Sequence, residues 1–287
     1  MKNKIVVMIF ICLLLWSSGL NPSLNAQTNE KKEKIPKVLK TRTEISYKFV
    51  EESGEYKKVF DSKTIYQYDD NGNQIEKTDY DVNSKLKAKI LYKYDDKGNT
   101  IEWAGYEAGN KLITKSLFKY DDKGKMIEEA IYGADGKLKF KCLFKYDDKG
   151  NQIEEVRNDA DGKLEQKLLY KYDDKDNLIK LSVYNAVGML DEKRIYNYDD
   201  KGNAIDVAWY GSDGKLTSEW LYKYDDKGNK IEWARYGADG KLTSKFLYKY
   251  DDRGNRTEQV EYMYYKTEGK VKEVPQSQTV WEYEFYK

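Results

Sequence analysis

The sequence predicts an all-β protein made of antiparallel β-hairpin repeats that form one long curled meander sheet, with a spiral, shell or barrel-like shape. The first observation is a motif, Tyr-x-Tyr-Asp-Asp, that recurs eight times at a constant spacing of 26 residues. The second is that each unit holds two turn signals separated by strand-length runs rich in Tyr, Ile, Leu, Trp and Thr. Because no amphipathic helix is present to cover an apolar sheet face, we expect the sheet to curl with that face inward. The second Tyr of the motif is Tyr68, Tyr94, Tyr120, Tyr146, Tyr172, Tyr198, Tyr224 and Tyr250.

The first residues have the features of an export signal. Two Lys residues precede an apolar run from Ile5 to Trp16, and a short polar stretch leads to an expected cleavage after Ala26. The run is short for a membrane span, so a retained anchor is the less favoured alternative. The expected organisation is a signal peptide at 1–26, a flexible charged linker at 27–41, N-terminal cap strands at 42–65, eight hairpin repeats at 66–262 and a C-terminal cap hairpin or strand at 263–287.

Composition excludes several classes of function. The chain has no His, which removes histidine bases, Ser-His-Asp triads and imidazole metal ligands. Signal cleavage would leave Cys142 as the one cysteine, which excludes an internal disulfide and multi-cysteine metal sites. The formal net charge of +1 lacks the basic excess that nucleic-acid binding needs. We therefore predict no cofactor and no nucleic-acid partner.

The strand register can be predicted from which pairing keeps similar side chains together. An even number of loop residues at both turns would place Ile231 opposite Tyr224 and Phe246, and Glu232 between Lys223 and Lys245. The same arithmetic predicts the cross-strand ion pairs Glu76–Lys89, Glu102–Lys115, Glu128–Lys141 and Glu154–Lys167. It fails in the fifth and sixth units, where Lys180 would face Lys193 and Asp206 would face Glu219. A three-residue loop with a left-handed Gly is the competing geometry, and it would pair Ile with Lys.

Candidate ligand-binding residues come from a second tyrosine column. Its members lie twelve residues after the Asp-Asp motif tyrosines, on a face otherwise made of Glu and Lys. They have two interpretations. Either their rings serve only to pack the sheet while the hydroxyls reach water, or the rings form a stacking ladder for an elongated ligand such as a glycan. Asn158 breaks the column. The ligand-stacking candidates are Tyr106, Tyr132, Tyr184, Tyr210 and Tyr236.

The Asp-Asp-Lys-Gly-Asn segments are interpreted as turns. Adjacent strand carboxylates point to opposite faces, so the eight Asp pairs do not form the converging acid pair of a glycosidase. Asp side chains that accept backbone N–H bonds are the favoured interpretation. Calcium binding is the more specific alternative, with Asp225, Asp226 and Asn229 as weak candidate ligands. Their order does not match an EF-hand loop. The structural turn glycines are Gly98, Gly150, Gly202, Gly228 and Gly254.

The segment Tyr222-Lys223-Tyr224-Asp225-Asp226-Lys227-Gly228 resembles the YD repeat of the RHS family, and the resemblance covers residues 66 to about 262. The intervening Asp-Gly-Lys-Leu segments are more weakly similar to MORN-like repeats. The RHS resemblance implies hairpins rolled into a β-sheet shell, in exported or envelope-associated proteins linked to carbohydrate binding, cell contact or toxin encapsulation. Asn and Ile replace the Arg-Leu that often follows the Gly in that family, and no toxin-like segment follows the repeats.

These features together predict an exported, non-enzymatic binding or scaffold module at the bacterial cell envelope. Carbohydrate binding is the most specific function that they indicate. The expected partner is an envelope polysaccharide or another surface protein. The alternative is an inhibitor or immunity-like partner of an exported RHS-type protein that adds strands at an exposed edge. An outer-membrane barrel or a glycan-active enzyme ranks third. The barrel is disfavoured because Lys77, Glu129, Glu155 and Gln259 would face lipid if the apolar face did, and the enzyme because no catalytic constellation is present.

Overall fold

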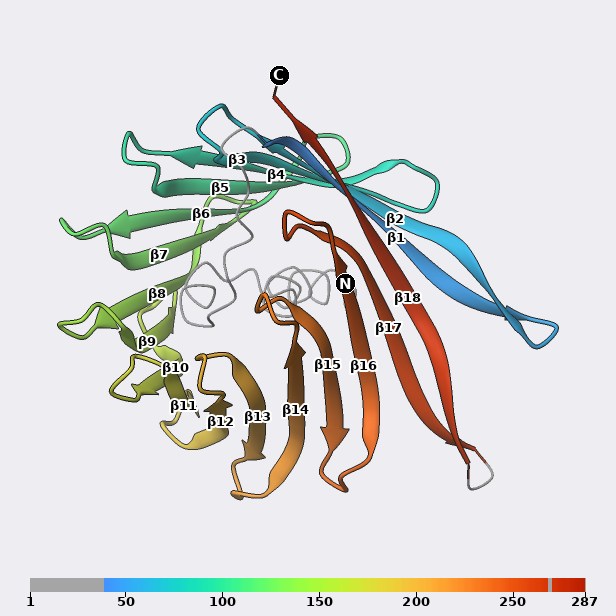
Figure 1. Cartoon of the computed structure of the whole chain (residues 1–287). Coiled ribbons are helices and arrows are strands. Elements are labelled where there is room, and N and C mark those ends of the chain that lie inside the picture. The colour runs from blue at the N-terminus through green and yellow to red at the C-terminus, as the bar shows by residue number, and fades with distance from the viewer. Residues whose placement is uncertain (1–38, 268–269, 287) are drawn as a thin grey trace.

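The computed structural model describes residues 39–267 and 270–286. They form one antiparallel sheet of 18 strands in which β1 also pairs with β18, so the sheet is a closed barrel (Figure 1). The barrel-like all-β fold is thus confirmed. The predicted signal and residues 27–38 of the predicted linker lie outside the described residues. The strands are β1 (Leu39–Glu52), β2 (Glu55–Tyr68), β3 (Gln74–Tyr80), β4 (Leu86–Tyr94), β5 (Thr100–Glu107), β6 (Leu112–Tyr120), β7 (Met126–Gly133), β8 (Leu138–Tyr146), β9 (Gln152–Asp159), β10 (Leu164–Tyr172), β11 (Leu178–Asn185), β12 (Leu190–Tyr198), β13 (Ala204–Gly211), β14 (Leu216–Tyr224), β15 (Lys230–Gly237), β16 (Leu242–Tyr250), β17 (Arg256–Thr267) and β18 (Lys270–Phe285).

The four terminal strands close the barrel. They are longer than the repeat strands, and Figure 1 shows the β1–β2 and β17–β18 hairpins extending past the neighbouring hairpins. Leu39, which we expected in the flexible linker, is instead the fully buried first residue of β1 and packs with Tyr66 and Tyr68. The terminal strands therefore pair with each other and close the sheet.

The turns adopt the geometry that the register arithmetic disfavoured. At the seventh Asp-Asp turn the Gly228 N–H donates to the Asp225 carbonyl at 2.9 Å, and the Asp225 N–H donates to the Asn229 carbonyl at 2.9 Å. Gly228 has a φ of 78°, the left-handed region that side chains disfavour. The loop therefore has three residues, and the predicted even loop is wrong.

A bulge next to each turn compensates for the odd loop. Tyr224 pairs with Lys230 but Lys223 pairs with Glu232, so Ile231 is an extra residue in the ladder, about 38% exposed. It does not lie opposite Tyr224 or Phe246 as predicted. The bulge returns Lys223 and Glu232 to the pairing that an even loop would have given, and this is why the Glu and Lys residues were assigned to the correct face despite the wrong turn.

Three of the four predicted Glu–Lys pairs form, but diagonally. The described residues contain no ion pair between Glu76 and Lys89, and Glu76 instead accepts a hydrogen bond from the Thr78 hydroxyl at 2.7 Å. Glu102 lies directly opposite Leu117, two residues from the predicted Lys115, because the three-residue loop and the bulge beside Tyr106 each shift the register by one residue. Its carboxylate still reaches Lys115 at 2.8 Å. Equivalent contacts join Glu128 to Lys141 at 3.4 Å and Glu154 to Lys167 at 2.7 Å. In the fifth unit Lys180 faces Lys171 and Ile195 instead of Lys193.

Large side chains on the two faces of the sheet differ in exposure, and this difference identifies the inner wall. Tyr66, Leu181 and Val183 are 1–5% exposed, whereas the side chains of Lys93 and Lys223 on the opposite face are 66% and 68% exposed. In a single-layer closed sheet, the crowded face is the concave one. The Tyr/Trp/Leu face therefore lines the barrel and the Glu/Lys face forms its outer wall.

A belt of tyrosine hydroxyls joins successive hairpins at the rim that carries the Asp-Asp turns. The Tyr146 hydroxyl donates to the Met126 carbonyl at 2.7 Å, which links one turn to the preceding one. Burial and the nearby charge of Asp121 raise the pKa of Tyr146 to about 12, so the hydroxyl remains a donor near neutral pH. The same bond recurs from Tyr94, Tyr120, Tyr172, Tyr198, Tyr224 and Tyr250, and Tyr283 and Tyr286 continue the belt to Arg256 and Tyr68.

We predict that Gly228→Ala lowers the free energy of unfolding by about 1–2 kcal/mol, because an L-residue is strained in the left-handed region. Chemical denaturation monitored by tryptophan fluorescence would measure the change. Gly211→Ala is the control: Gly211 opens a turn of the same kind without a positive φ, and a Cβ there would meet its nearest atom at 3.4 Å. Equal losses in the two variants would contradict the turn assignment.

The belt predicts a second stability difference. Tyr146→Phe should destabilise the barrel by about 0.5–1.5 kcal/mol, because the Met126 carbonyl loses its side-chain donor. Tyr132→Phe serves as the control, since no hydrogen bond of the Tyr132 hydroxyl occurs within the described part of the chain. A Tyr146→Phe variant as stable as Tyr132→Phe would show that the belt contributes nothing.

Candidate ligand-binding surface

The inner wall carries a continuous aromatic stack that the sequence does not predict as a unit. Trp209, Trp220, Trp233 and Phe246 come from β13 to β16, and their consecutive ring centroids are 4.8, 5.3 and 4.3 Å apart. The planes lie within 28° of parallel. Each of these residues projects from the same face of the sheet, so the alternation within the strands indicates their shared face but not their contacts.

The stack is suited to holding the wall together. Its inner members have both ring faces occupied by neighbours, and the guanidinium of Arg194 covers Trp209 at 3.7 Å from the ring centroid. A ligand that stacks on an aromatic ring needs a free face. The indole N–H groups of Trp209 and Trp220 are buried and have no hydrogen-bond partner within the described residues, so the stack stabilises the wall by packing alone.

A polar region of the inner wall holds two carboxylates, the half-buried Glu129 on β7 and the buried Glu155 on β9. Burial raises the pKa of both groups, and the charge of Glu155 raises the pKa of Glu129 further. The Tyr170 hydroxyl donates to Glu155 Oε2 at 3.2 Å, and the Gln152 amide donates to the same oxygen at 3.3 Å. These residues were expected on the apolar face, and the barrel places that face inside.

The predicted tyrosine column lies on the outer wall. Tyr132 faces Lys115 across β6 and β7, and Tyr210 faces Lys193 across β12 and β13, with the Lys193 ammonium 4.5 Å from the Tyr210 ring centroid. All five candidates are half-buried. Members two strands apart are separated by about 9.6 Å, and Tyr132 and Tyr184, four strands apart, by about twice that distance. The column therefore presents separate rings along the wall, and the sheet does not bring them into contact with one another. The five are Tyr106, Tyr132, Tyr184, Tyr210 and Tyr236.

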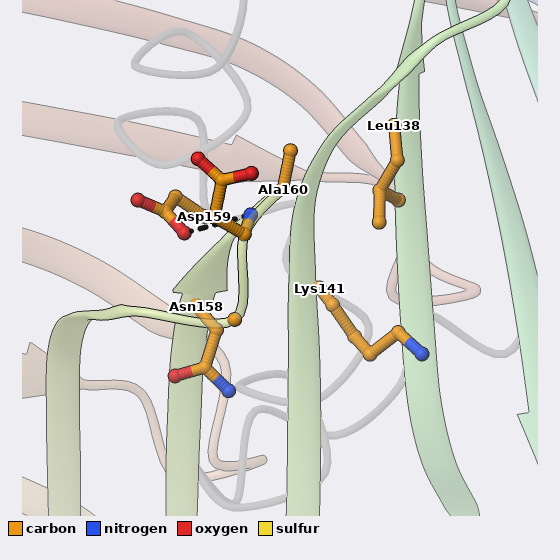
Figure 2. Close-up of a pocket in the computed structure, with 7 residues that line it drawn as sticks. Leu138, Lys141, Asn158, Asp159 and Ala160 are labelled. Atoms are coloured by element: carbon orange, nitrogen blue, oxygen red, sulfur yellow. Dashed lines mark hydrogen bonds between the residues drawn. The ribbon is translucent and has the colours of Figure 1, made fainter.

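A hollow opens where Asn158 interrupts this column. It has a volume of about 310 Å³, and Figure 2 shows Asn158 and Lys141 on neighbouring strands beside the turn that follows β9. Lys141 and Asn158 are paired across β8 and β9. The Asn158 amide has no partner within the described residues, and the Lys141 ammonium lies 3.4 Å from Glu128. The lining is Leu138, Lys141, Asn158, Asp159, Ala160, Asp161 and Gly162.

The hollow has the composition of a small polar subsite. The Asn158 amide offers two donors and an acceptor, and Leu138 and Ala160 supply apolar surface. Asp159 is occupied by its own turn, since its Oδ1 accepts the N–H groups of Asp161 at 3.0 Å and Lys163 at 2.9 Å. The sequence showed the break in the column at Asn158, but the hollow depends on the course of the following turn.

The calcium candidates are engaged in turn bonds. Asp225 Oδ1 accepts the Asn229 N–H at 2.7 Å, and its Oδ2 accepts the Asn229 side-chain amide at 2.8 Å. These bonds act against burial and hold the pKa of Asp225 below its ordinary value. Asp226 is an exposed residue of the same loop. Within the described residues no group of three or more Cys, Asp or Glu side chains is arranged to hold a metal ion.

Comparison with known proteins gives distant structural likenesses. No family model and no curated protein matches the chain. A porin-like protein from Bacteroides uniformis is 11% identical with a TM-score of 0.48, over 85% of this chain and 97% of that one. The complex TcdB2-TccC3 is 15% identical with a TM-score of 0.28, over 75% of this chain and 15% of that one. The Tc holotoxin pore of Photorhabdus luminescens is 12% identical with a TM-score of 0.20, over 75% of this chain and 20% of that one.

The described residues also contain no helix with the length and apolar character needed to cross a bilayer.

The neighbours Glu154 and Glu155 predict opposite effects of pH. Burial raises the pKa of Glu155, so ionising it costs stability as the pH rises above the ordinary carboxyl range. Glu155→Gln should therefore raise the melting temperature at about pH 7.5 and change it little at about pH 4.

Hydrogen bonds from Lys145 and Lys167 lower the pKa of Glu154, so the ionised Glu154 stabilises the fold above the ordinary carboxyl range. Glu154→Gln should thus lower the melting temperature at about pH 7.5, and a shift of the same sign in both variants would contradict the two-wall assignment.

Proposed function

We propose that the protein is a non-enzymatic binding module of the bacterial cell envelope whose outer wall binds an elongated glycan. The observation that carries the proposal is the regularly spaced tyrosine column with a polar hollow at its centre. Tyr132 and Tyr184 flank the hollow two strands to either side, about 9.6 Å away each. A sugar ring combines an apolar C–H face with a rim of hydroxyls, so it matches aromatic rings beside an unpaired amide.

The dimensions favour a ligand that makes several weak contacts. A volume of about 310 Å³ is at the lower limit of ligand pockets, which is room for one small unit of a longer chain. The rings on either side would hold neighbouring units, and contacts on one polymer add because binding at the first raises the effective concentration at the next. The half-burial of the rings preorganises them but limits the area that each can offer.

The outer wall favours contact with water over contact with lipid. Lys119 and Lys145 side chains are 67% and 69% exposed on it. Charged groups facing the bilayer midplane cost about 2–4 kcal/mol each. A lysine occupies the equivalent position in β4, β6, β8, β10, β14 and β16. Export to the periplasm, the outer surface or the medium is part of this proposal.

The alternative role as an inhibitor of an RHS-type partner needs a different contact. That hypothesis relied on strand addition at an exposed edge. Because β1 and β18 are hydrogen-bonded to each other from Leu39 to Lys48, neither described terminal strand offers an open edge over that length. A partner would instead have to contact the outer wall or the projecting hairpins.

A pull-down with separated envelope fractions tests the proposal. The purified protein is incubated with insoluble cell-wall glycan, surface polysaccharide and detergent-solubilised envelope protein, with and without calcium. We expect saturable binding to a glycan fraction, weakened about tenfold by Asn158→Ala or by the double replacement of Tyr132 and Tyr184 with Ala. Tyr80→Ala is the matched control, because Tyr80 occupies the same column on β3, six strands from the hollow. Retention by the protein fraction alone would contradict glycan binding, and strict calcium dependence would contradict the interpretation of the Asp-Asp turns.

A further inference from the structure

The outer wall repeats a three-residue ion cluster in which one acid bridges two lysines on the adjacent strands. Glu154 on β9 lies 2.6 Å from Lys145 on β8 and 2.7 Å from Lys167 on β10. Glu102 and Glu128 make the same contacts with their flanking lysines, at 2.8–3.4 Å. The acid recurs with the 26-residue period, and its column reads Glu76, Glu102, Glu128, Glu154, Lys180, Asp206, Glu232 and Glu258.

The fifth unit places a third lysine where the acid belongs. Lys180 on β11 lies directly opposite Lys171 on β10, and Lys193 on β12 occupies the position that Lys167 holds around Glu154. Within the described residues, none of the three makes an ion pair. Lys193 instead rests over the Tyr210 ring at 4.5 Å. The flanking lysines of the cluster are thus retained while their bridging carboxylate is missing.

Such an arrangement is unfavourable for the empty protein. Like charges directly opposite on neighbouring strands repel, and the first to fourth and seventh and eighth units avoid this by keeping an acid at the position. An external oxyanion would supply the negative oxygens that the missing carboxylate supplies elsewhere. Lysine ammonium groups bind phosphate and sulfate well as compact point charges.

We propose that Lys171, Lys180 and Lys193 form an oxyanion site on the outer wall, which takes a phosphate or sulfate group. Tyr184, on the same face of β11 as Lys180, and Tyr210, beneath Lys193, give the site aromatic neighbours. The site stands on the charge pattern and does not depend on glycan binding at Asn158. An anionic group carried on a polymer and the free ion share the same chemistry here.

The reciprocal change in the sixth unit identifies the competing explanation. There Asp206 accepts a hydrogen bond from Asn197 at 2.9 Å, and Glu219 has no lysine partner within the described residues. The lysine cluster of one copy facing the acids of a second copy would also compensate both charges. Self-association is therefore measured in the same experiment.

The test compares two variants with the same change in net charge. Lys180→Glu completes the cluster, whereas Lys223→Glu destroys the contact that Lys223 makes with Glu232 at 2.9 Å. Melting curves are recorded with sodium pyrophosphate and with sodium chloride at matched ionic strength. Wild-type protein should gain about 2–4 °C with saturable dependence on pyrophosphate. Without the anion, Lys180→Glu should melt higher than wild type and Lys223→Glu lower.

The anion response separates the outcomes. Lys180→Glu should lose the pyrophosphate-dependent shift, and Lys223→Glu should keep it. An equal response in both variants, or no saturable response in wild type, would overturn the site. Binding of dextran sulfate but not dextran, abolished by Lys180→Glu, would support an anion carried on a polymer, and binding of pyrophosphate alone would support the free ion. A dimer at low salt that Lys180→Glu dissociates, with no anion response, would overturn the site in favour of a contact between copies.

Discussion

The pairing of β1 with β18 is the constraint on which the other features depend. A single-layer sheet with one apolar face has nothing to cover that face, and its two end strands offer unpaired N–H and C=O groups. Joining the ends solves both problems at once, since it turns the apolar face inward and removes the open edges. Arg42 and Glu44 on β1 face Tyr283 and Trp281 on β18, and the Trp281 indole donates to Glu44 at 2.7 Å. Closure therefore uses specific side chains as well as the backbone ladder.

The repeat made most of the fold predictable, and the bulges account for what was missed. The Tyr and Gly spacing indicates hairpins, and the alternation of Glu/Lys with aromatic residues identifies the two faces. The register was wrong in detail because an Ile in a bulge, such as Ile231, has the same local sequence pattern as an Ile in a regular strand. The odd loop moves residues to the opposite face, and the bulge moves them back. The Glu and Lys residues were therefore assigned to the correct face although the turn was incorrect. The pairing that closes the barrel could not be predicted from the repeat, because β1 and β18 lie outside it.

The candidate surface was only partly visible in the sequence. The tyrosine column follows from alternation within the strands, and Asn158 stands out as its exception. A hollow, however, depends on how the turn at Asp159 folds over Leu138, which spacing alone does not define. The inner stack shows a related limit: Trp209 and Trp220 belong to different columns of the repeat, and they meet diagonally because a bulge shifts one strand against the next.

The tyrosine belt has a consequence for how such barrels can change in size. Each bond, as from Tyr146 to Met126, joins one hairpin to the one before it by the same donor and acceptor positions, so every repeat is interchangeable at that rim. Gain or loss of one 26-residue unit would preserve the bonding of all remaining units and alter the barrel by two strands. The circumference of such a barrel can therefore change in steps of two strands through tandem duplication of the 26-residue unit. The terminal strands that close the barrel stay the same.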